Sequence, residues 1–251
     1  MSFLSGLKAF AGSTAGQFVQ VAALAFIAKK MASNTTPANN IPETAEANID
    51  AGVREPVKVS TANKIPVLYG TAFFPGIITD AQMTNSNKTM WYCLTLSERT
   101  GTKLSDNQAS AYVFKDIYWN KQRIIFKADG QTVDYTVDAE SNQDISLRDQ
   151  VRIYCYAGNS STPRIPENYT NTATTQAYNL MPEWTSTTHN MNDLIFVLVR
   201  VDYNREKNVT GLGELTFEVS NSMFLPGDVL NDYMTNTRYG AGIASAEILR
   251  T

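Results

Sequence analysis

Histidine and cysteine are scarce in this sequence, whose 251 residues include one histidine and two cysteines. A structural zinc site takes four Cys or His ligands, so this small supply argues against one. The cysteines, Cys93 and Cys155, each lie within an apolar stretch, WYCLTL and IYCYAG. We therefore expect buried free thiols rather than a disulfide framework, and no bound metal or cofactor.

Clustered positive charge and long apolar runs are also missing. The net charge is −3 and Lys29-Lys30 is the only basic doublet, whereas a nucleic-acid-binding surface needs grouped Lys and Arg to neutralise phosphates. The apolar segment FVQVAALAFIA at residues 18 to 28 is shorter than the ~20 residues that span a bilayer. Only Lys8 is charged ahead of it, which makes it a poor signal peptide. These features argue against nucleic-acid recognition, a membrane span and export.

Motifs of known catalytic sites are absent from the sequence. GLGE at Gly211 to Glu214 has no third glycine and precedes a strand-like segment, so we interpret it as a loop. His189 stands alone in a polar loop and is expected to be a surface residue rather than a catalytic base. We therefore expect a protein that is not an enzyme.

Residues 1–52 are predicted to form a helical arm followed by a linker. Thr14 and Gln17 have capping-box spacing at the start of a helix over residues 14 to 31. Residues 32 to 52 are polar, small and proline-containing, as in linkers. The helix is apolar around most of its circumference, so it should dock on a protein surface. The residues expected in that contact are Phe18, Val21, Leu24, Ala25 and Ala28.

Residues 53–225 are predicted to form a β-rich body of the barrel or sandwich type. A body of this length could consist of two β subdomains. The stretch Leu194 to Val199 is apolar without alternation, which indicates a central strand covered on both faces. YVFKDIYWNKQRIIF predicts two short strands joined by a tight turn at Asn120-Lys121. Residues 159 to 192 are predicted to be a long polar loop, which would be functional or pack against a partner.

Residues 226–251 are predicted to form a C-terminal helix and an elbow, which makes the whole chain mainly β with some helix (α+β). In LNDYMTNTRYGAGI, residues 230 to 243, Leu230, Tyr233 and Met234 share one helical face, and Asp228 lies just ahead as an N-terminal cap. The following Thr-Asn-Thr-Arg-Tyr-Gly-Ala-Gly then breaks the helix.

The order of segments from about Ile65 to Ile243 resembles the central hub (tail-tip, host-specificity) proteins of long-tailed bacteriophages. The succession includes IPVLYGTAFFPGIITDA, WYCLTLSERTG, DIYWNKQRI, VRIYCYAG, GLGELTFEVSN and DVLNDYMTNTRYGAGI. The last phrase is the most specific, because in that family such a helix and an R-Y-G-x-G elbow lead from one hub domain into the next. The matching residues are Asp228, Asp232, Tyr233, Thr235, Asn236, Arg238, Tyr239, Gly240 and Gly242.

The resemblance implies a structural virion protein, assembled in the bacterial host cytoplasm, that closes the distal end of a phage tail tube. It implies a homotrimer of β-rich hub domains, in which two similar barrel domains per subunit would match a sixfold tube ring. The implied partners are the tail tube and distal tail proteins, the C-terminus of the tape-measure protein, and downstream tip or fibre proteins. Membrane contact would be confined to infection. Family members usually continue for hundreds of residues beyond the elbow, so receptor binding would belong here to a separate polypeptide.

Two other functions stay open from the residues alone. The aromatic residues, among them Trp91, Trp119 and Trp184, could form the platform of a carbohydrate-binding β-sandwich module, although core and interface packing is their default role. A tail-associated cell-wall hydrolase could use two carboxylates that lie far apart in the chain, although no pair stands out.

Overall fold

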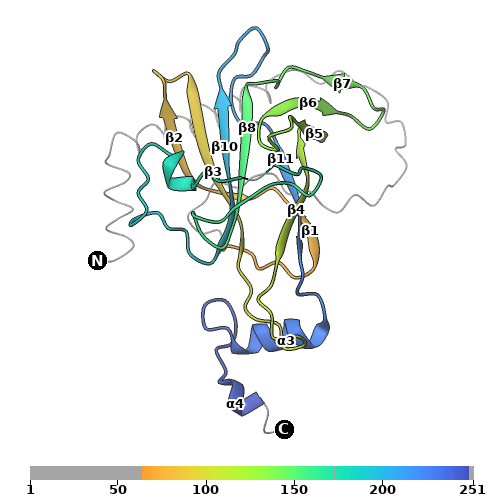
Figure 1. The fold of residues 1–251 in the computed structure, drawn as a ribbon, viewed down its shortest axis with the longest axis vertical. Helices are drawn as coiled ribbons and strands as arrows, with labels where there is room; N and C mark the ends of the chain where they lie inside the picture. Colours follow the sequence, from red (N-terminus) through yellow and green to blue (C-terminus); the bar gives the residue numbers. More distant parts are fainter. Residues whose placement is uncertain (1–63, 172, 249–251) are drawn as a thin grey trace, which may run out of the picture. The chain divides into compact units, whose positions relative to one another are not determined.

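The computed structural model describes residues 64–171 and 173–248, which form two antiparallel β-sheets followed by the helix α3 (Pro226–Thr235) and the short helix α4 (Ser245–Ile248) (Figure 1). The chain is therefore mainly β with a helix near its C-terminus, as the sequence predicts. The predicted helical arm and linker, with Phe18, Val21, Leu24, Ala25 and Ala28, lie outside the described residues.

The five-stranded sheet has the order β2-β3-β10-β8-β9. Its central strand β10 (Leu194–Asp202) pairs with β3 on one side and with β8 on the other. Every residue from Ile195 to Val199 has 0% exposure, which confirms the predicted central strand covered on both faces. The other members are β2 (Ile77–Thr84), β3 (Thr89–Glu98), β8 (Val151–Ala157) and β9 (Pro163–Arg164).

The six-stranded sheet has the order β1-β11-β4-β5-β6-β7. Its strands are β1 (Thr71–Phe74), β4 (Tyr112–Trp119), β5 (Gln122–Phe126), β6 (Val133–Val137), β7 (Gln143–Asp144) and β11 (Leu215–Asn221). The predicted tight turn between β4 and β5 is confirmed, since Trp119 pairs with Gln122 and the two residues between them have φ of 48° and 69°. Positive φ at both central residues is the property of the turn that matches strand twist.

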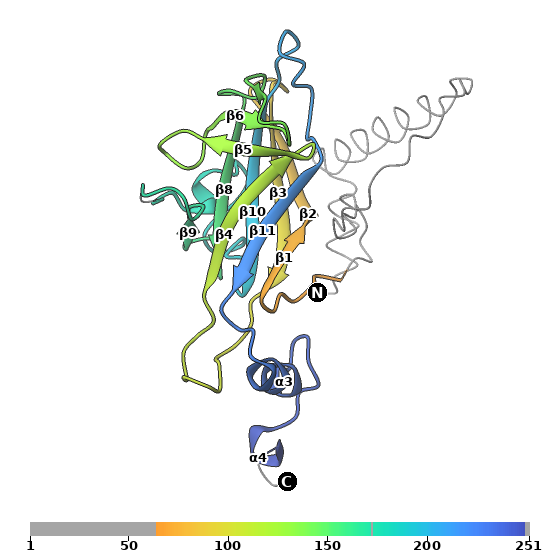
Figure 2. The same cartoon turned by 90° about the vertical axis from the view of Figure 1, so that its right-hand side faces the viewer.

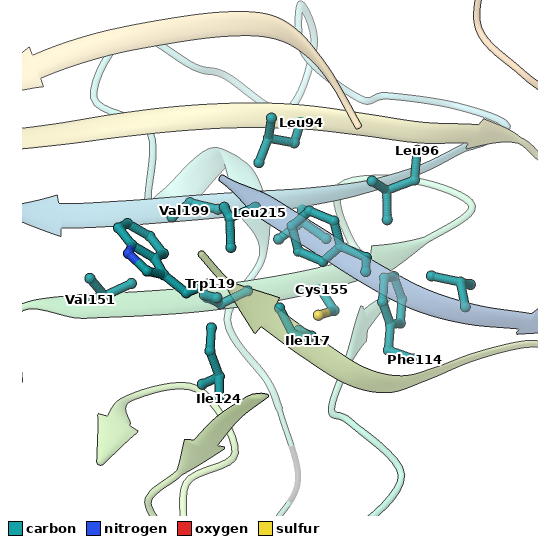
Figure 3. Packing of buried hydrophobic residues seen from close by; sticks show 14 of the residues in the cluster. Leu94, Leu96, Phe114, Ile117, Trp119, Ile124, Val151, Cys155, Val199 and Leu215 are labelled. Atoms are coloured by element: carbon teal, nitrogen blue, oxygen red, sulfur yellow. The ribbon is translucent and has the colours of Figure 1, made fainter. Parts of the chain in front are cut away.

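The two sheets share one apolar core, which both supply with alternate residues of their strands. Leu94 and Leu96 of β3 face Phe114 and Ile117 of β4 and Leu215 of β11 across it (Figure 3). In β10, the side chains of 195, 197 and 199 belong to this core, while those of 196 and 198 belong to a second cluster on the opposite face of the sheet. Strand periodicity of two residues thus gives the five-stranded sheet two apolar faces.

The long segment between β8 and β10 covers the outer face of the five-stranded sheet. It contains a short 3-10 helix, η2 (Ala177–Asn179), and buries Met181 and Trp184 against Phe196 and other residues of the sheet. The apolar residues of this loop therefore pack on their own sheet, and its contact with a partner stays a prediction. Cys93 and Cys155 are buried free thiols, as predicted.

The tryptophans offer no surface platform. Trp91, Trp119 and Trp184 are 7%, 6% and 6% exposed, so their default role in packing is confirmed. His189 lies partly exposed in this loop, and its ring stacks on Trp184 at 5.2 Å between centroids with an interplanar angle of 6°.

Candidate interaction site at the C-terminal helix

The C-terminal helix α3 (Pro226–Thr235) lies beyond one end of the sheets, beside the connection between β3 and β4 (Figures 1 and 2). It begins at Pro226, a residue whose fixed φ suits the first helical turn. The prediction that Asp228 caps the helix is wrong, because the N-cap is Leu225 and no side chain bonds the free amides there. Asp228 lies inside the first turn, where its carboxylate has another role.

Asp228 anchors the start of α3 to the β3–β4 connection. Its side chain is 3% exposed. One carboxylate oxygen accepts a hydrogen bond from the Ser105 backbone N–H at 2.8 Å, and the other accepts one from the Ser105 hydroxyl at 2.7 Å. A buried carboxylate with two donors is stable where an unpaired one would not be.

Asp232, one turn later, joins three separate parts of the chain. Oδ1 accepts from the Gly101 N–H at 2.8 Å, and Oδ2 accepts from the phenols of Tyr69 at 2.7 Å and Tyr239 at 2.6 Å. Gly101 is needed for this approach, because a Cβ there would lie 2.9 Å from Oδ1. Burial, and then the hydrogen bond and charge of Asp232, raise the pKa of both phenols above the usual tyrosine value. Both phenols therefore stay protonated and act as donors.

A buried polar network fixes the segment that supplies these donors. Thr100 receives a hydrogen bond from Asn221 at 2.9 Å, donates to the Ser110 hydroxyl at 2.6 Å, and its backbone N–H donates to the Tyr112 phenol at 2.9 Å. Asn221 also donates to the Leu68 carbonyl at 2.7 Å. All four polar residues are buried, so the network holds the β3–β4 connection against both sheets.

The elbow after α3 folds back on the end of the helix. Asn236 Oδ1 accepts from the backbone N–H groups of Arg238 and Tyr239, at 2.8 and 3.3 Å. Ala241 and Ile243 donate to the last helical carbonyls, those of residues 233 and 234, both at 2.8 Å. These bonds satisfy helix carbonyls that would otherwise have no partner.

Two glycines shape this elbow for different reasons. A Cβ at Gly240 would collide with the Tyr233 carbonyl oxygen and come within 2.8 Å of the Asn236 carbonyl oxygen. Gly242 has φ +66°, a conformation that favours glycine. The first glycine of R-Y-G-x-G is therefore required because a Cβ would not fit there, and the second because its backbone conformation favours glycine.

Arg238 ties the elbow to the end of the five-stranded sheet. Its Nε lies 2.8 Å from Glu98 Oε2, at the end of β3, and its Nη1 donates to the Asn192 carbonyl at 3.4 Å. Burial raises the pKa of Glu98, while the Arg238 guanidinium opposes that effect. The ion pair therefore places a positive charge beside a largely buried carboxyl.

The apolar residues of α3 point the other way. Leu230 is 59% exposed and Tyr233 54% exposed, and the turn that precedes the helix leaves Phe224 65% and Leu225 45% exposed. The buried residues of α3 are Asp228 and Asp232. The helix therefore turns its charged face inward and its apolar face outward.

The structure brings most of the sequence-predicted residues together where α3 and its elbow meet the β3–β4 connection and the end of β3. We call this region the joint. Asp232, Asn236, Arg238, Tyr239, Gly240 and Gly242 hold the elbow, and Asp228 holds the start of the helix. The Tyr233 carbonyl accepts a hydrogen bond from the Ala241 N–H, while the Tyr233 side chain is exposed. Sequence reasoning missed the partners Tyr69, Glu98, Gly101 and Ser105, which no local spacing connects with the helix.

The contacts of this site hold a segment of chain in place. Both carboxylates are occupied by donors from their own chain. Within residues 64–171 and 173–248 there is no group of three or more His, Cys, Asp or Glu side chains that could hold a metal ion. In the same part of the chain, no helix is long and apolar enough to cross a membrane.

Comparison with known proteins gives no family. The chain matches no protein-family model, and no curated protein is significantly similar to it.

Proposed function

We propose that this protein is a structural component of a bacteriophage tail tip, the hub that closes the distal end of the tail tube. The observation that carries the proposal is the joint at α3. The residues that match the hub family's connector phrase are the same ones that hold the helix and its elbow, through contacts of Asp228, Asp232, Asn236, Arg238 and Tyr239.

Such a joint suits a connector between domains. A chain that leaves a β-body through a free loop would exit in many directions, whereas α3 is fixed by two buried carboxylates and by a folded elbow. Because the polar contacts are internal, the apolar face stays available to other proteins. A fixed exit with an exposed apolar face fits a protein that is built into an assembly.

The proposed assembly has three copies around the tail axis. Its partners would be the tail tube and distal tail proteins, the C-terminus of the tape-measure protein, and downstream tip or fibre proteins that read the receptor. Closed symmetry is the usual form of protein oligomers, and a threefold hub could adapt a sixfold tube to the tip.

The carbohydrate-binding alternative gains no support from the tryptophans. All three are packed inside the fold, where they cannot present the exposed rings that a sugar platform needs. Cell-wall hydrolysis by purified protein would be the direct evidence for the other alternative.

A density map of intact particles of the encoding phage tests the proposal. We expect three copies of this chain around the tail axis, at the distal end of the tube, with the exposed face of α3 in a protein contact. Particles assembled without the chain serve as the control and should lack the corresponding density. A chain located in the capsid, a sixfold ring or a single copy would contradict the trimeric hub.

A further inference from the structure

A second site lies in the six-stranded sheet, where we propose that a cavity between β4 and β5 binds a small carboxylate. The cavity has a volume of about 240 Å³, and its lining includes the charged residues Lys115, Asp116 and Arg123 and the phenol of Tyr169. This site involves neither α3 nor a partner protein, so it does not rest on the tail-tip function.

The cavity exists because the two strands of this hairpin separate. β4 and β5 pair at two positions, both next to the turn, the first of them Trp119 with Gln122. Beyond these pairs β5 leaves the line of β4 (Figure 2). The residues that would continue the pairing, 115–117 and 124–126, line the two sides of the cavity instead.

An irregularity in each strand pairing accompanies the separation. The register of β4 against β11 shifts at Glu218, which stands opposite both Lys115 and Asp116. The register of β5 against β6 shifts between Ile125 and Phe126. β-Bulges redirect side chains and end strand pairing, and they are frequent next to binding sites. The bulge in β4 therefore places two charged side chains at the cavity.

The segment after β9 holds the two strands apart. Pro166 is buried at the cavity, and the Glu167 backbone N–H donates to the Phe114 carbonyl of β4 at 2.8 Å. On the other side, the Phe126 N–H of β5 donates to the Tyr169 phenol oxygen at 2.7 Å. Backbone groups of both strands thus find their partners in this segment, so the strands do not close over the cavity.

Tyr169 brings a free proton donor to the cavity. Its oxygen accepts from the Phe126 N–H, and in the described part of the chain its hydroxyl proton has no acceptor. Burial raises the pKa of the phenol, so the proton stays on it at neutral pH. The ring is fixed by an edge-to-face contact with Phe126, with centroids 5.6 Å apart and an interplanar angle of 82°. A ligand atom beside this hydroxyl should therefore be a hydrogen-bond acceptor.

The charges around the cavity favour an anion. Arg123 Nη1 lies 3.7 Å from Asp116 Oδ1, and the two side chains are 45% and 32% exposed. Lys115 has no ion pair within residues 64–171 and 173–248. The lining thus carries two positive charges and one negative charge. The Tyr169 phenol interacts electrostatically with Arg123 and Asp116, so these groups lie near one another.

A small carboxylate meets all of these requirements. Its single negative charge balances the excess positive charge of the lining. Its two oxygens can accept from the Tyr169 hydroxyl and from a cation at the same time, and such charged hydrogen bonds are the stronger kind. The volume lies below the ~300–1,000 Å³ of pockets for drug-sized ligands, which limits the ligand to a small acid.

The test is a titration of the isotope-labelled full-length chain with sodium acetate, followed through its amide shifts in nuclear magnetic resonance spectra. Acetamide, a neutral molecule of the same shape, is the second probe. The variants are Lys115→Gln, Arg123→Gln and Tyr169→Phe. The matched control is Lys121→Gln, which removes the same charge from an exposed residue of the adjoining turn that does not line the cavity. Circular dichroism verifies that each variant keeps the β fold.

We expect acetate to shift the Phe126 amide in a saturable way, with a dissociation constant of about 1–10 mM. Lys115→Gln and Arg123→Gln should each weaken binding about two- to fivefold, as the loss of an exposed ion pair does. Tyr169→Phe should weaken it about tenfold, because a charged acceptor loses its donor. Lys121→Gln should bind acetate as the native chain does, and acetamide should give no saturable shift.

The site is overturned if acetate gives no saturable shift at the cavity, or if acetamide gives the same one. Acetate binding that the double variant of Lys115 and Arg123 leaves at native strength would overturn it as well. These two cation variants decide the question by themselves if Tyr169→Phe does not fold. A chain that occupies the tail tip without binding acetate would keep the proposed hub and lose this site.

Discussion

Asp232 collects hydrogen bonds from Tyr69, Gly101 and Tyr239. Each bond to a charged acceptor contributes about 1.5–3 kcal/mol, and removing the acceptor would leave several buried donors unpaired. The sequence pointed to Asp232 and Tyr239 through their family resemblance. It could not point to Tyr69 or Gly101, because these donors lie 163 and 131 positions away and only the folded chain brings them near.

Gly240 gives the sharpest prediction at this scale. Gly240→Ala places a methyl group against the carbonyl oxygens of Tyr233 and Asn236, which are backbone atoms that cannot move aside cheaply. Overpacking of this kind costs about 1–3 kcal/mol. We expect the elbow to open about 10- to 100-fold more often, which limited trypsin digestion should report as faster cleavage after Arg238.

Gly227→Ala is the matched control, because a Cβ at this position of α3 meets no atom within 4 Å. Its cleavage rate after Arg238 should equal that of the native chain. Equal rates in the Gly240→Ala protein would mean that the elbow does not depend on the space at Gly240.

Strands and turns were the elements that the sequence predicted well. The apolar run of β10 and the turn at Asn120-Lys121 are local signals, and the structure confirms both. No local signal in the sequence indicated the orientation of α3. Its apolar face is exposed because Asp228 and Asp232 find donors in a distant connection, and such donors override the usual rule that apolar residues face inward.

A charge in β10 should abolish folding. Phe196 is 0% exposed and stacks on Tyr156 with ring centroids 4.9 Å apart. Phe196→Asp would bury a carboxylate without a partner at a cost of several kcal/mol, against a total stability of about 5–15 kcal/mol. We expect no cooperative unfolding transition in urea when circular dichroism is followed.

Phe73→Asp is the corresponding change at a position that is 51% exposed, on the edge strand β1. That protein should unfold cooperatively, with a small loss of stability. A Phe196→Asp protein that unfolds cooperatively at near-native stability would show that the side chain tolerates water, contrary to the packing described above.

At the scale of the whole molecule, the two sheets and their shared core belong to residues that follow the predicted arm and linker. The sequence assigned an apolar docking role to the arm, with Phe18, Val21, Leu24, Ala25 and Ala28 in the contact. That role stays a prediction. Because the two sheets of the described residues share a core of their own, we expect the arm to matter for assembly rather than for folding of the β-body.

Deletion of residues 1–33 tests this division of roles. We expect the truncated chain to keep the circular dichroism and cooperative unfolding of the β-body but to be missing from assembled tails, as measured by its occupancy in purified particles. A full-length chain with Phe18→Ser and Leu24→Ser should show the same defect, because the apolar contact and not the length is lost. Native occupancy and full infectivity of the truncated form would make the arm dispensable.

The position of Asp232 also determines how the molecule responds to mechanical force. Tyr69 leads into β1 of one sheet, while Gly101 follows β3 of the other, and Arg238 holds the end of β3 through Glu98. A pull on the chain beyond the elbow is therefore divided between both sheets before it reaches β11. Without the joint, the same pull would act on β11 alone and separate its hydrogen bonds one after another. With it, several bonds must break together, so the fold resists tension applied at its C-terminal side.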